Sequence, residues 1–259
     1  LGGAGSTVSS LTYVNGGQAV AGGTNAQVMR AGLWEVRKKI SSFVSDTAFE
    51  WTSGGNKLTG GFYFADYSSR DKWVLGNQVL LTAEPNARLL NMTLNGGRTA
   101  TLNGFTSGPG FQVDAFYKGA DYSFYAVDEF QITPELRIDG GIRWQRHVVD
   151  ATLRTPSGTI DRDGNPNTLY DNAVNVLGGP RQLRYADSAW SWTAGINYDI
   201  TSQIGVFARY SRGNSFPMFD NLREGLRLID EVDTYEGGLK ISTPMVSFYA
   251  TRFHNKFDG

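Results

Sequence analysis

The sequence lacks cysteine altogether and contains only two histidines among its 259 residues. The absence of cysteine excludes disulfide scaffolds, thiolate zinc sites and cysteine nucleophiles. No apolar run approaches the roughly 18 residues that a transmembrane helix needs, and the chain opens with no basic-then-apolar signal peptide. The chain also lacks a basic surplus, because 24 lysines and arginines face 25 aspartates and glutamates. This balance argues against a nucleic-acid partner.

Glycine and aromatic side chains are abundant, with 32 glycines and 13% aromatic residues. The dominant pattern is an alternation of apolar and polar residues, which predicts strands with two different faces. It runs through residues 136–147, 189–200 and 204–211, and helical periodicity is scarce. In the second of these segments, one face carries Trp190, Trp192, Ala194, Ile196, Tyr198 and Ile200.

Short turn-forming segments join the predicted strands in pairs. Gly, Pro, Asn, Ser and Thr gather at 53–56, 132–135, 201–203 and 242–244, and residues of this kind favour tight turns. The pattern predicts about eight strands in four hairpins, namely 44–52 with 57–67, 122–131 with 136–147, 186–200 with 204–213, and 232–241 with 245–255.

Long connections separate the hairpins, at 68–121, 148–185 and 214–231, and residues 1–43 lie on the same side. Long loops on one side and tight turns on the other are typical of bacterial outer-membrane barrels. The ten steps from Trp190 to Ile200 span roughly 33 Å, or roughly 23 Å along the membrane normal at a ~45° tilt, close to the ~25 Å apolar band of such barrels. A soluble antiparallel sheet with one wet face is the alternative, although it leaves the loop asymmetry and the aromatic residues near the strand ends unexplained.

We therefore predict an all-β fold in which residues 44–259 form part of an antiparallel transmembrane β-barrel. Residues 1–43 are predicted as an extracellular loop region with, at most, a strand end. A sheet that spans lipid must close on itself, and eight strands suffice for a small barrel. Long loops and a glycine-rich, charged inner face fit a slice of a larger barrel better. The chain begins at Leu1 and ends at Gly259 without a processing signal, and we interpret it as a fragment.

Three stretches resemble the barrel of TonB-dependent outer-membrane receptors. Residues 125–144 (YAVDEFQITPELRIDGGIRW) are similar to the family's hairpin of an aromatic–acidic strand, a short turn and a strand ending in Gly-x-Arg-aromatic. Residues 210–222 (YSRGNSFPMFDNL) resemble its strand-to-loop segment, and residues 235–240 (YEGGLK) its Glu-x-Gly-x-Lys strand. Asn214 and Ser215 depart from the pattern, because the family often has an aromatic residue and an arginine there. The plug, the TonB-contacting box and the final strand are not visible, so the resemblance implies a middle slice of a barrel of about 22 strands.

The resemblance implies TonB-dependent active import of a bulky nutrient across the Gram-negative outer membrane. The cargo would be a ferric siderophore or other iron chelate, cobalamin or an oligosaccharide. The implied partners are this small-molecule ligand, outer-membrane lipid and lipopolysaccharide, and the TonB–ExbB–ExbD complex, which acts through a plug. One alternative is a passive outer-membrane porin or small structural barrel, which has no plug. A second alternative is a soluble β-rich carbohydrate-binding module, which needs no detergent.

Loops carry binding residues more often than the elements they connect. Aromatic rings stack on flat ligands or sugars, and arginines pair with carboxylates. These chemistries occur together in the three long connections, which also contain Arg162 and Tyr170. The ligand-binding candidates are Trp73, Phe105, Phe111, Tyr117, Arg181, Arg184, Phe216, Phe219 and Arg223. For any one of them, the alternative role is packing between loops or contact with surface lipopolysaccharide.

Charged residues also follow the polar face of the predicted strands. The predicted lumen-facing wall consists of Arg137, Asp139, Arg143, Arg209, Glu236 and Lys240. Charges are tolerated there because the wall faces water or the plug. The wall is either a plug-docking surface or ligand path, or a solvated surface with local ion pairs. We further predict that Arg209 and Glu236 pair across neighbouring strands.

No enzymatic chemistry, resident cofactor or metal site is predicted. Of the two histidines, His147 is expected to be a polar residue at the outer end of a strand. Residues 161–167 resemble the start of a calcium loop, but an EF-hand needs Gly at its sixth position and Glu at its twelfth. The chain has Pro166 and Asn172 there, so an Asp-Gly turn at a loop tip is the better interpretation.

Overall fold

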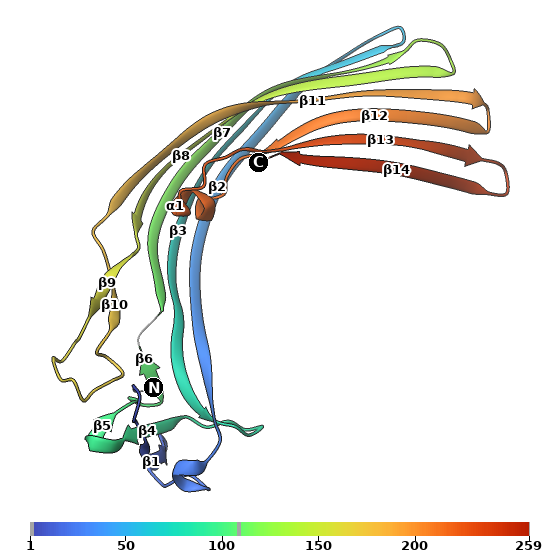
Figure 1. The fold of residues 1–259 in the computed structure, drawn as a ribbon. Coiled ribbons are helices and arrows are strands. Elements are labelled where there is room, and N and C mark those ends of the chain that lie inside the picture. Colours follow the sequence, from blue (N-terminus) through green and yellow to red (C-terminus); the bar gives the residue numbers. More distant parts are fainter. Residues whose placement is uncertain (1–2, 108–109, 259) are drawn as a thin grey trace. The chain divides into compact units, whose positions relative to one another are not determined.

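A computed structural model of the chain describes residues 3–107 and 110–258, and its main feature is a large antiparallel sheet (Figure 1). Strands follow one another across this sheet in sequence order, each hydrogen-bonded to its neighbours along the chain. They are β2 (Val28–Ser53), β3 (Asn56–Thr82), β7 (Phe111–Gln131), β8 (Leu136–Arg154), β11 (Arg181–Thr201), β12 (Ile204–Ser215), β13 (Asp230–Ser242) and β14 (Ser247–Asp258). A further short strand, β6 (Phe105–Ser107), pairs with β3. The prediction of eight strands in four hairpins is confirmed.

The four tight turns lie where the turn-forming residues predict them. Between β2 and β3, Gly54 adopts a left-handed φ of 58°, which glycine reaches without a Cβ penalty. Between β11 and β12, the Thr201 hydroxyl accepts hydrogen bonds from the backbone N–H groups of Gln203 and Ile204. Between β13 and β14, the Thr243 hydroxyl accepts one from the backbone N–H of Val246. Local side-chain chemistry therefore fixes this end of each hairpin.

The strands extend much further into the long connections than the sequence predicts. β2 begins at Val28, inside the region 1–43, and β3 continues to Thr82. β8 continues to Arg154, and β11 begins at Arg181. The predicted boundaries of the loops 68–121 and 148–185 are therefore wrong. The strict alternation of apolar and polar residues ends where neither face of a strand has to meet hydrocarbon. The strands continue beyond that point because backbone hydrogen bonding does not depend on the alternation.

The chain divides into two compact units. Unit 1 contains the described residues of 1–40, 69–116 and 152–182, and unit 2 those of 41–68, 117–151 and 183–258. In unit 1, β1 (Val8–Tyr13), β4 (Leu90–Leu94) and β5 (Arg98–Thr99) form a small sheet, with the 3₁₀ turns η1 (Gly23–Asn25) and η2 (Asn95–Gly97) beside it. A separate hairpin joins β9 (Pro156–Ile160) and β10 (Val174–Leu177). The small sheet has its own apolar core of Leu11, Val20, Leu80, Leu90, Met92, Leu94 and Ala100.

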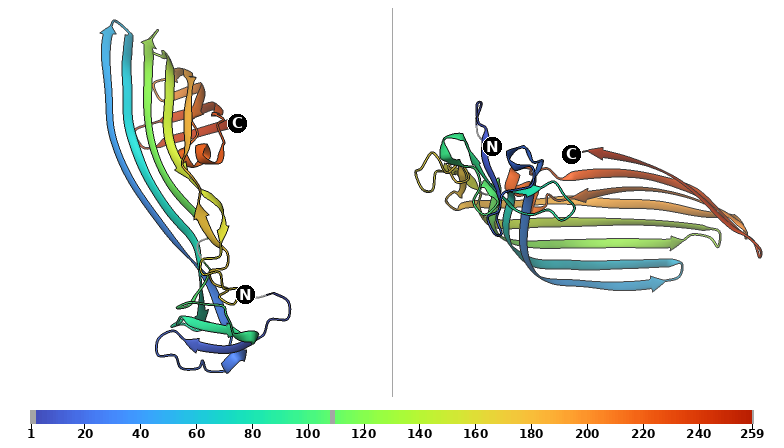
Figure 2. Two further views of the ribbon diagram at one scale, coloured as in Figure 1. Left: turned by 90° about the vertical axis from the view of Figure 1, so that its left-hand side faces the viewer. Right: turned by 90° about the horizontal axis from the view of Figure 1, so that it is seen from below.

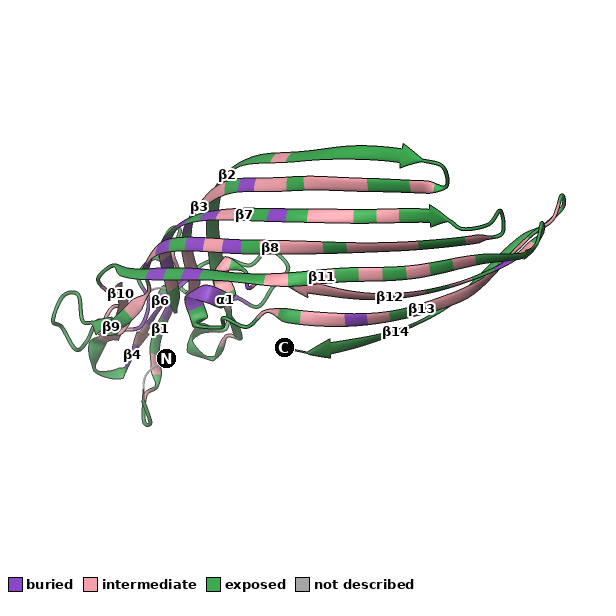
Figure 3. Ribbon diagram, turned by 90° about the horizontal axis from the view of Figure 1, so that it is seen from above, coloured by how far each residue is buried: buried purple, intermediate pink, exposed green. Residues whose placement is uncertain are grey.

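Unit 2 is a curved wall of antiparallel strands, which Figure 2 shows side by side in two further views. A short helix, α1 (Phe219–Glu224), interrupts the connection between β12 and β13 and lies on the concave side of the strands (Figure 1). The opposite face is apolar and open to the surroundings. In Figure 3, exposed residues recur along β11, and β14 is exposed over its whole length.

The open apolar face of unit 2 has no covering layer among the described residues. Register pairs such as Ile196 with Ala208 and Tyr198 with Val206 share this face. Its exposed members include Phe62, Phe124, Ile142, Trp190, Ile196, Tyr198 and Ile200. A soluble sheet would bury a patch of this extent. None of the helices in the described residues is long and apolar enough to cross a membrane.

Candidate functional site

Strands, rather than loops, hold six of the nine predicted ligand-binding residues, five of them in the main strands and Phe105 in the short strand β6. Trp73 lies in β3, Phe111 and Tyr117 in β7, and Arg181 and Arg184 in β11. Their predicted loop location is wrong because these strands continue past the alternating segment. The remaining three lie just after β12 (Phe216) and in α1 (Phe219 and Arg223).

Aromatic side chains hold the segment between β12 and β13 against the concave face of unit 2. Phe219 stacks on Tyr117 with ring centroids 4.3 Å apart, and its centroid lies 5.7 Å from that of Tyr67. Phe216 stacks on the His147 ring at 5.2 Å. The ring of Tyr117 is fully buried. Three predicted ligand contacts, Tyr117, Phe216 and Phe219, are thus brought together in one packed aromatic cluster.

His147 is the polar centre of this aromatic cluster. Its Nδ1 lies 2.6 Å from Asp121 Oδ1 and 3.1 Å from the Tyr67 hydroxyl. The residue is buried, and its Nε2 has no hydrogen-bond partner among the described residues. The sequence predicts a polar residue at the outer end of a strand, but His147 lies within β8, which continues to Arg154. The sequence places Asp121 at a loop boundary, and no local pattern shows that the two residues meet.

Charged groups around α1 are largely engaged with one another. Arg223 is buried and donates hydrogen bonds to Asp220 at 2.6 Å and to Glu224 at 3.3 Å. Leu222, on the same turn, is fully buried.

Arg184 lies 3.8 Å from Asp150, and both side chains are mostly exposed. Arg223 thus contributes to fixing α1, whereas Arg184 remains open to the surroundings.

The residues predicted to line a lumen fall on the concave face that α1 covers. On β8, Arg143 and His147 are four residues apart, so their side chains leave the same face. Arg137 and Asp139 continue this alternation. On β12 and β13, Arg209 lies directly opposite Glu236, and Lys240 lies opposite Gly205. The charged wall therefore consists of residues from β8, β12 and β13, and β11 lies between β8 and β12.

Arg209 pairs with Asp139 rather than with Glu236. The carboxylate of Asp139 is nearly buried and receives an ion pair from the Arg209 guanidinium, which also donates to the Thr193 hydroxyl at 3.0 Å. A Cβ on Gly195 would lie 2.9 Å from both partners, so glycine leaves the space in which they meet. The predicted Arg209–Glu236 ion pair is wrong, although the shared face and the opposite register are confirmed.

Two further wall cations lie over aromatic rings. The Arg143 guanidinium is 5.4 Å from the ring centre of Tyr63. The Lys240 ammonium is 5.0 Å from that of Phe207 and donates a hydrogen bond of 3.3 Å to Asn197. Cation–π contacts of this kind orient charges without neutralising them, so the wall retains a positive character at these positions.

In unit 1, Trp73 lies next to an ion pair between the partly exposed Lys38 and the buried Asp71. The Lys38 ammonium is 5.8 Å from the Trp73 ring centre and 3.1 Å from Asp71 Oδ2. The Asp71 side chain is fully buried and also accepts a hydrogen bond from the Ser69 hydroxyl. Phe105 and Phe111 are 39% and 37% exposed, and they are the predicted phenylalanines of unit 1 that remain accessible to a ligand.

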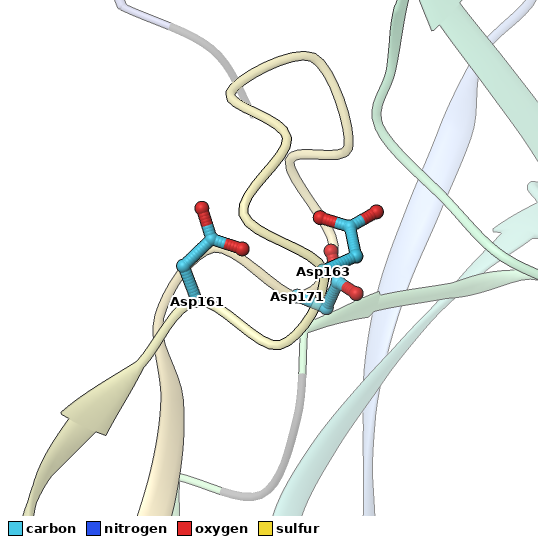
Figure 4. Close-up of side chains that lie close together, drawn as sticks. All are labelled: Asp161, Asp163 and Asp171. Atoms are coloured by element: carbon cyan, nitrogen blue, oxygen red, sulfur yellow. The ribbon is translucent and has the colours of Figure 1, made fainter.

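An acidic cluster occupies the loop between β9 and β10. Carboxylate oxygens of Asp161, Asp163 and Asp171 lie within 4.8 Å of one another (Figure 4). Asp161 accepts a hydrogen bond from the backbone N–H of Gly164, and Asp163 accepts others from Asn165 N–H and the Thr168 hydroxyl. These hydrogen bonds lower the pKa of Asp163. Gly164 has a φ of 69°, as the predicted Asp-Gly turn requires.

A charged pair that the sequence analysis missed lies at one end of the open apolar face. The Arg212 guanidinium makes two hydrogen bonds to Asp233, at 2.6 and 2.7 Å, and lies 5.0 Å from the Trp192 ring centre. The Tyr210 hydroxyl donates to the same carboxylate at 2.8 Å. The alternation of side chains along paired strands could have revealed this group. Trp192, Arg212 and Asp233 are register partners on three neighbouring strands and share one face.

Comparison with known protein families gives a match over nearly the whole chain. A family model described as TonB-dependent receptor-like, β-barrel, matches residues 5–259. No curated protein sequence matches the chain.

Two solved structures are similar to this chain. The ferric-catecholate import receptor Fiu from Escherichia coli K12, in its closed form, has a TM-score of 0.54 and 17% identity, over 86% of this chain and 32% of that one. The ferric yersiniabactin uptake receptor FyuA from Yersinia pestis has a TM-score of 0.45 and 12% identity, over 86% and 33%. The chain thus spans about a third of the length of these structures. The similarity to the E. coli structure shows the fold.

Proposed function

Because the chain belongs to the family of TonB-dependent receptor-like β-barrels, we propose that it forms barrel wall and surface loops of a receptor that imports a bulky nutrient. The observation that carries this proposal is the asymmetry of the connections in the main sheet. Tight turns alternate with long connections. The long connections that lie in unit 1 fold around an apolar core of their own. Folded loops on a rigid sheet are suited to ligand recognition.

The proposed location is the outer membrane of a Gram-negative cell. The open apolar face of unit 2 would meet lipid, with Trp192 and Tyr210 at an interface, where amphipathic rings are favoured. The Arg212–Asp233 pair beside them would lie at the level of lipid or lipopolysaccharide head groups. This arrangement supports the membrane assignment because the described residues beside Ile196 on this face, Ala194 and Tyr198 on β11 and Ala208 on β12, carry no charge.

The charged wall on the concave face would line the barrel lumen. Its members would meet water, a plug domain or a passing ligand, which tolerate charge in a way that lipid does not. Coupling to the TonB–ExbB–ExbD complex would act through such a plug. We assign these partners to the whole receptor. This chain spans only about a third of the length of each similar structure.

Cargo recognition is assigned to the accessible members of the predicted ligand-binding set. Phe105 and Phe111 are partly exposed rings in unit 1, and Arg181 and Arg184 are exposed cations at the start of β11. Tyr117, Phe216, Phe219 and Arg223 instead serve to dock α1. The cargo classes that the family suggests are ferric chelates, which the E. coli and Yersinia receptors are described as importing, cobalamin and oligosaccharides.

The proposal is tested by uptake in a strain that lacks its own receptors for the cargo. Cells expressing the complete gene receive a radiolabelled ferric catecholate, cobalamin or an oligosaccharide, each with and without a functional TonB. We expect saturable, TonB-dependent accumulation of one cargo class.

Two results would contradict active import. Accumulation that is equal without TonB and rises linearly with concentration would identify a passive channel. Recovery of the protein in the aqueous fraction without detergent would instead indicate the soluble carbohydrate-binding alternative.

A further inference from the structure

A pocket of about 270 Å³ opens in unit 1 between two connections that are far apart in the sequence. One side comes from the segment before β7 and the other from the loop between β9 and β10. Its lining includes Leu102, Phe105, Arg162, Tyr170, Asp171 and Val174. The pocket therefore combines two aromatic rings, two aliphatic side chains, one cation and one carboxylate.

A tight hairpin presents the apolar side of this pocket. Leu102 and Phe105 exchange backbone hydrogen bonds of 2.8 and 2.9 Å. The two residues between them, Asn103 and Gly104, have φ values of 50° and 85°, the geometry of an Asn-Gly hairpin turn. Asn103 is the one residue other than glycine with a positive φ in residues 3–107 and 110–258. The turn leaves Leu102 51% and Phe105 39% exposed, so both can contact a ligand.

Backbone hydrogen bonds lock the two sides of the pocket together. The N–H of Thr99 donates to the carbonyl of Asn167 at 2.7 Å, and the N–H of Leu169 donates to the carbonyl of Thr99 at 2.9 Å. The loop between β9 and β10 is itself closed by the hydrogen bond from Arg162 N–H to the Asp171 carbonyl. A pocket held in this way is already formed before a ligand arrives, which lowers the entropic cost of binding.

The charges around the pocket favour a neutral ligand. The lining carries one cation, Arg162, and one carboxylate, Asp171. Asp161 and Asp163 each place a carboxylate oxygen within 4.8 Å of a carboxylate oxygen of Asp171, so negative charge is concentrated beside the pocket. An anionic chelate would be repelled by this excess of negative charge. A neutral group with both donors and acceptors would satisfy Arg162 and Asp171 together.

We propose that this pocket binds one pyranose ring of a neutral saccharide. The apolar C–H face of the ring would stack on Phe105 or Tyr170, while its hydroxyls accept from Arg162 and donate to Asp171. The volume lies just below the ~300–1,000 Å³ of pockets that enclose a drug-sized ligand, so it suits a single ring within a longer molecule. This inference deepens the proposed function by naming the oligosaccharide as the cargo class that unit 1 recognises.

The test measures binding of methyl hexopyranosides to the purified full-length protein in detergent by saturation-transfer NMR titration. The Phe105→Ala variant should weaken binding about threefold to tenfold, the size of one lost aromatic contact. Arg162→Gln should also weaken it, without disturbing the apolar turn. Phe116→Ala is the matched control, because Phe116 is a similarly exposed ring of unit 1 that neither lines the pocket nor belongs to the predicted ligand-binding set. Its affinity should equal that of the unchanged protein.

The origin of the sugar is resolved by two further arms. Competition by a free oligosaccharide, with impaired uptake by Phe105→Ala cells, would identify the sugar as cargo. Competition only by the core oligosaccharide of lipopolysaccharide, with normal uptake, would identify it as a surface component. Either result supports a saccharide pocket.

The saccharide assignment is overturned if no glycoside binds, or if both pocket variants bind as the control does. Binding of an anionic ferric catecholate that Arg162→Gln abolishes would overturn it as well. TonB-dependent uptake of a different cargo would leave the proposed import function standing while the saccharide assignment fails.

Discussion

Replacement of Ile196 by arginine tests whether the open face of unit 2 meets hydrocarbon. Ile196 is four residues from both Trp192 and Ile200, roughly 13 Å along the strand in each direction, or roughly 9 Å along the membrane normal at a ~45° tilt. It therefore lies near the middle of a ~25 Å apolar band. Its register partner is Ala208, so no carboxylate lies directly opposite to neutralise a new cation. We expect Ile196→Arg to reduce the free energy of unfolding by roughly 2–4 kcal/mol.

The matched control is Thr234→Arg on the concave face. Thr234 has Ser211 and Asn255 as register partners and lies two residues from Glu236 on the same face, so an arginine there has both water and an acid within reach. Both variants are unfolded by urea from phospholipid vesicles, with intrinsic fluorescence as the signal. Equal losses of stability in the two variants, within error, would refute the membrane assignment of the open face.

Three further changes test the packing of the wall and the loops. Phe219→Ala should cost about 0.5–1.5 kcal/mol for each aromatic pair lost, and faster hydrogen exchange in α1 would reveal it, whereas unchanged protection would show that the cluster does not hold the helix. Arg209→Ala should destabilise the protein more than Glu236→Ala, because it leaves the nearly buried carboxylate of Asp139 unpaired at a cost of roughly 1–3 kcal/mol; equal losses in urea titrations would contradict the observed pairing. Hydrogen bonds hold the pKa of Asp163 below its ordinary value of 3.8, so its contribution is present above that value and is lost as the pH falls through the lowered one. NMR of the loop should show this transition, and Asp163→Asn should remove it.

The sequence predicts the hairpins well because their determinants are local. The turn between β11 and β12 depends on the Thr201 side chain and its own neighbours, and period-two alternation separates the two faces of each strand. The common face of Arg209 and Glu236 follows from the same rule. Residues that share a face and a register can therefore be assigned without a structure.

Strand length and long-range pairing could not be predicted in the same way. Alternation marks only the part of a strand whose faces meet different surroundings, so the extensions to Val28, Thr82 and Arg181 left no signal. The meeting of Asp121 with His147, 26 residues apart, depends on tertiary register. Arg209 pairs with Asp139 instead of Glu236 in the space above Gly195. The alternation of residues along two neighbouring strands does not reveal this space.

The small sheet of unit 1 constrains how this part of the chain can change under selection. Its core draws on β1, on the end of β3, on β4 and on the segment around Ala100, and Leu169 from another connection packs against it. Selection for mutations in one of these segments therefore acts on a block that folds as a whole. Tolerated variants should be single substitutions at exposed positions or exchange of the entire block, whereas deletions within one segment should lead to misfolded, degraded protein.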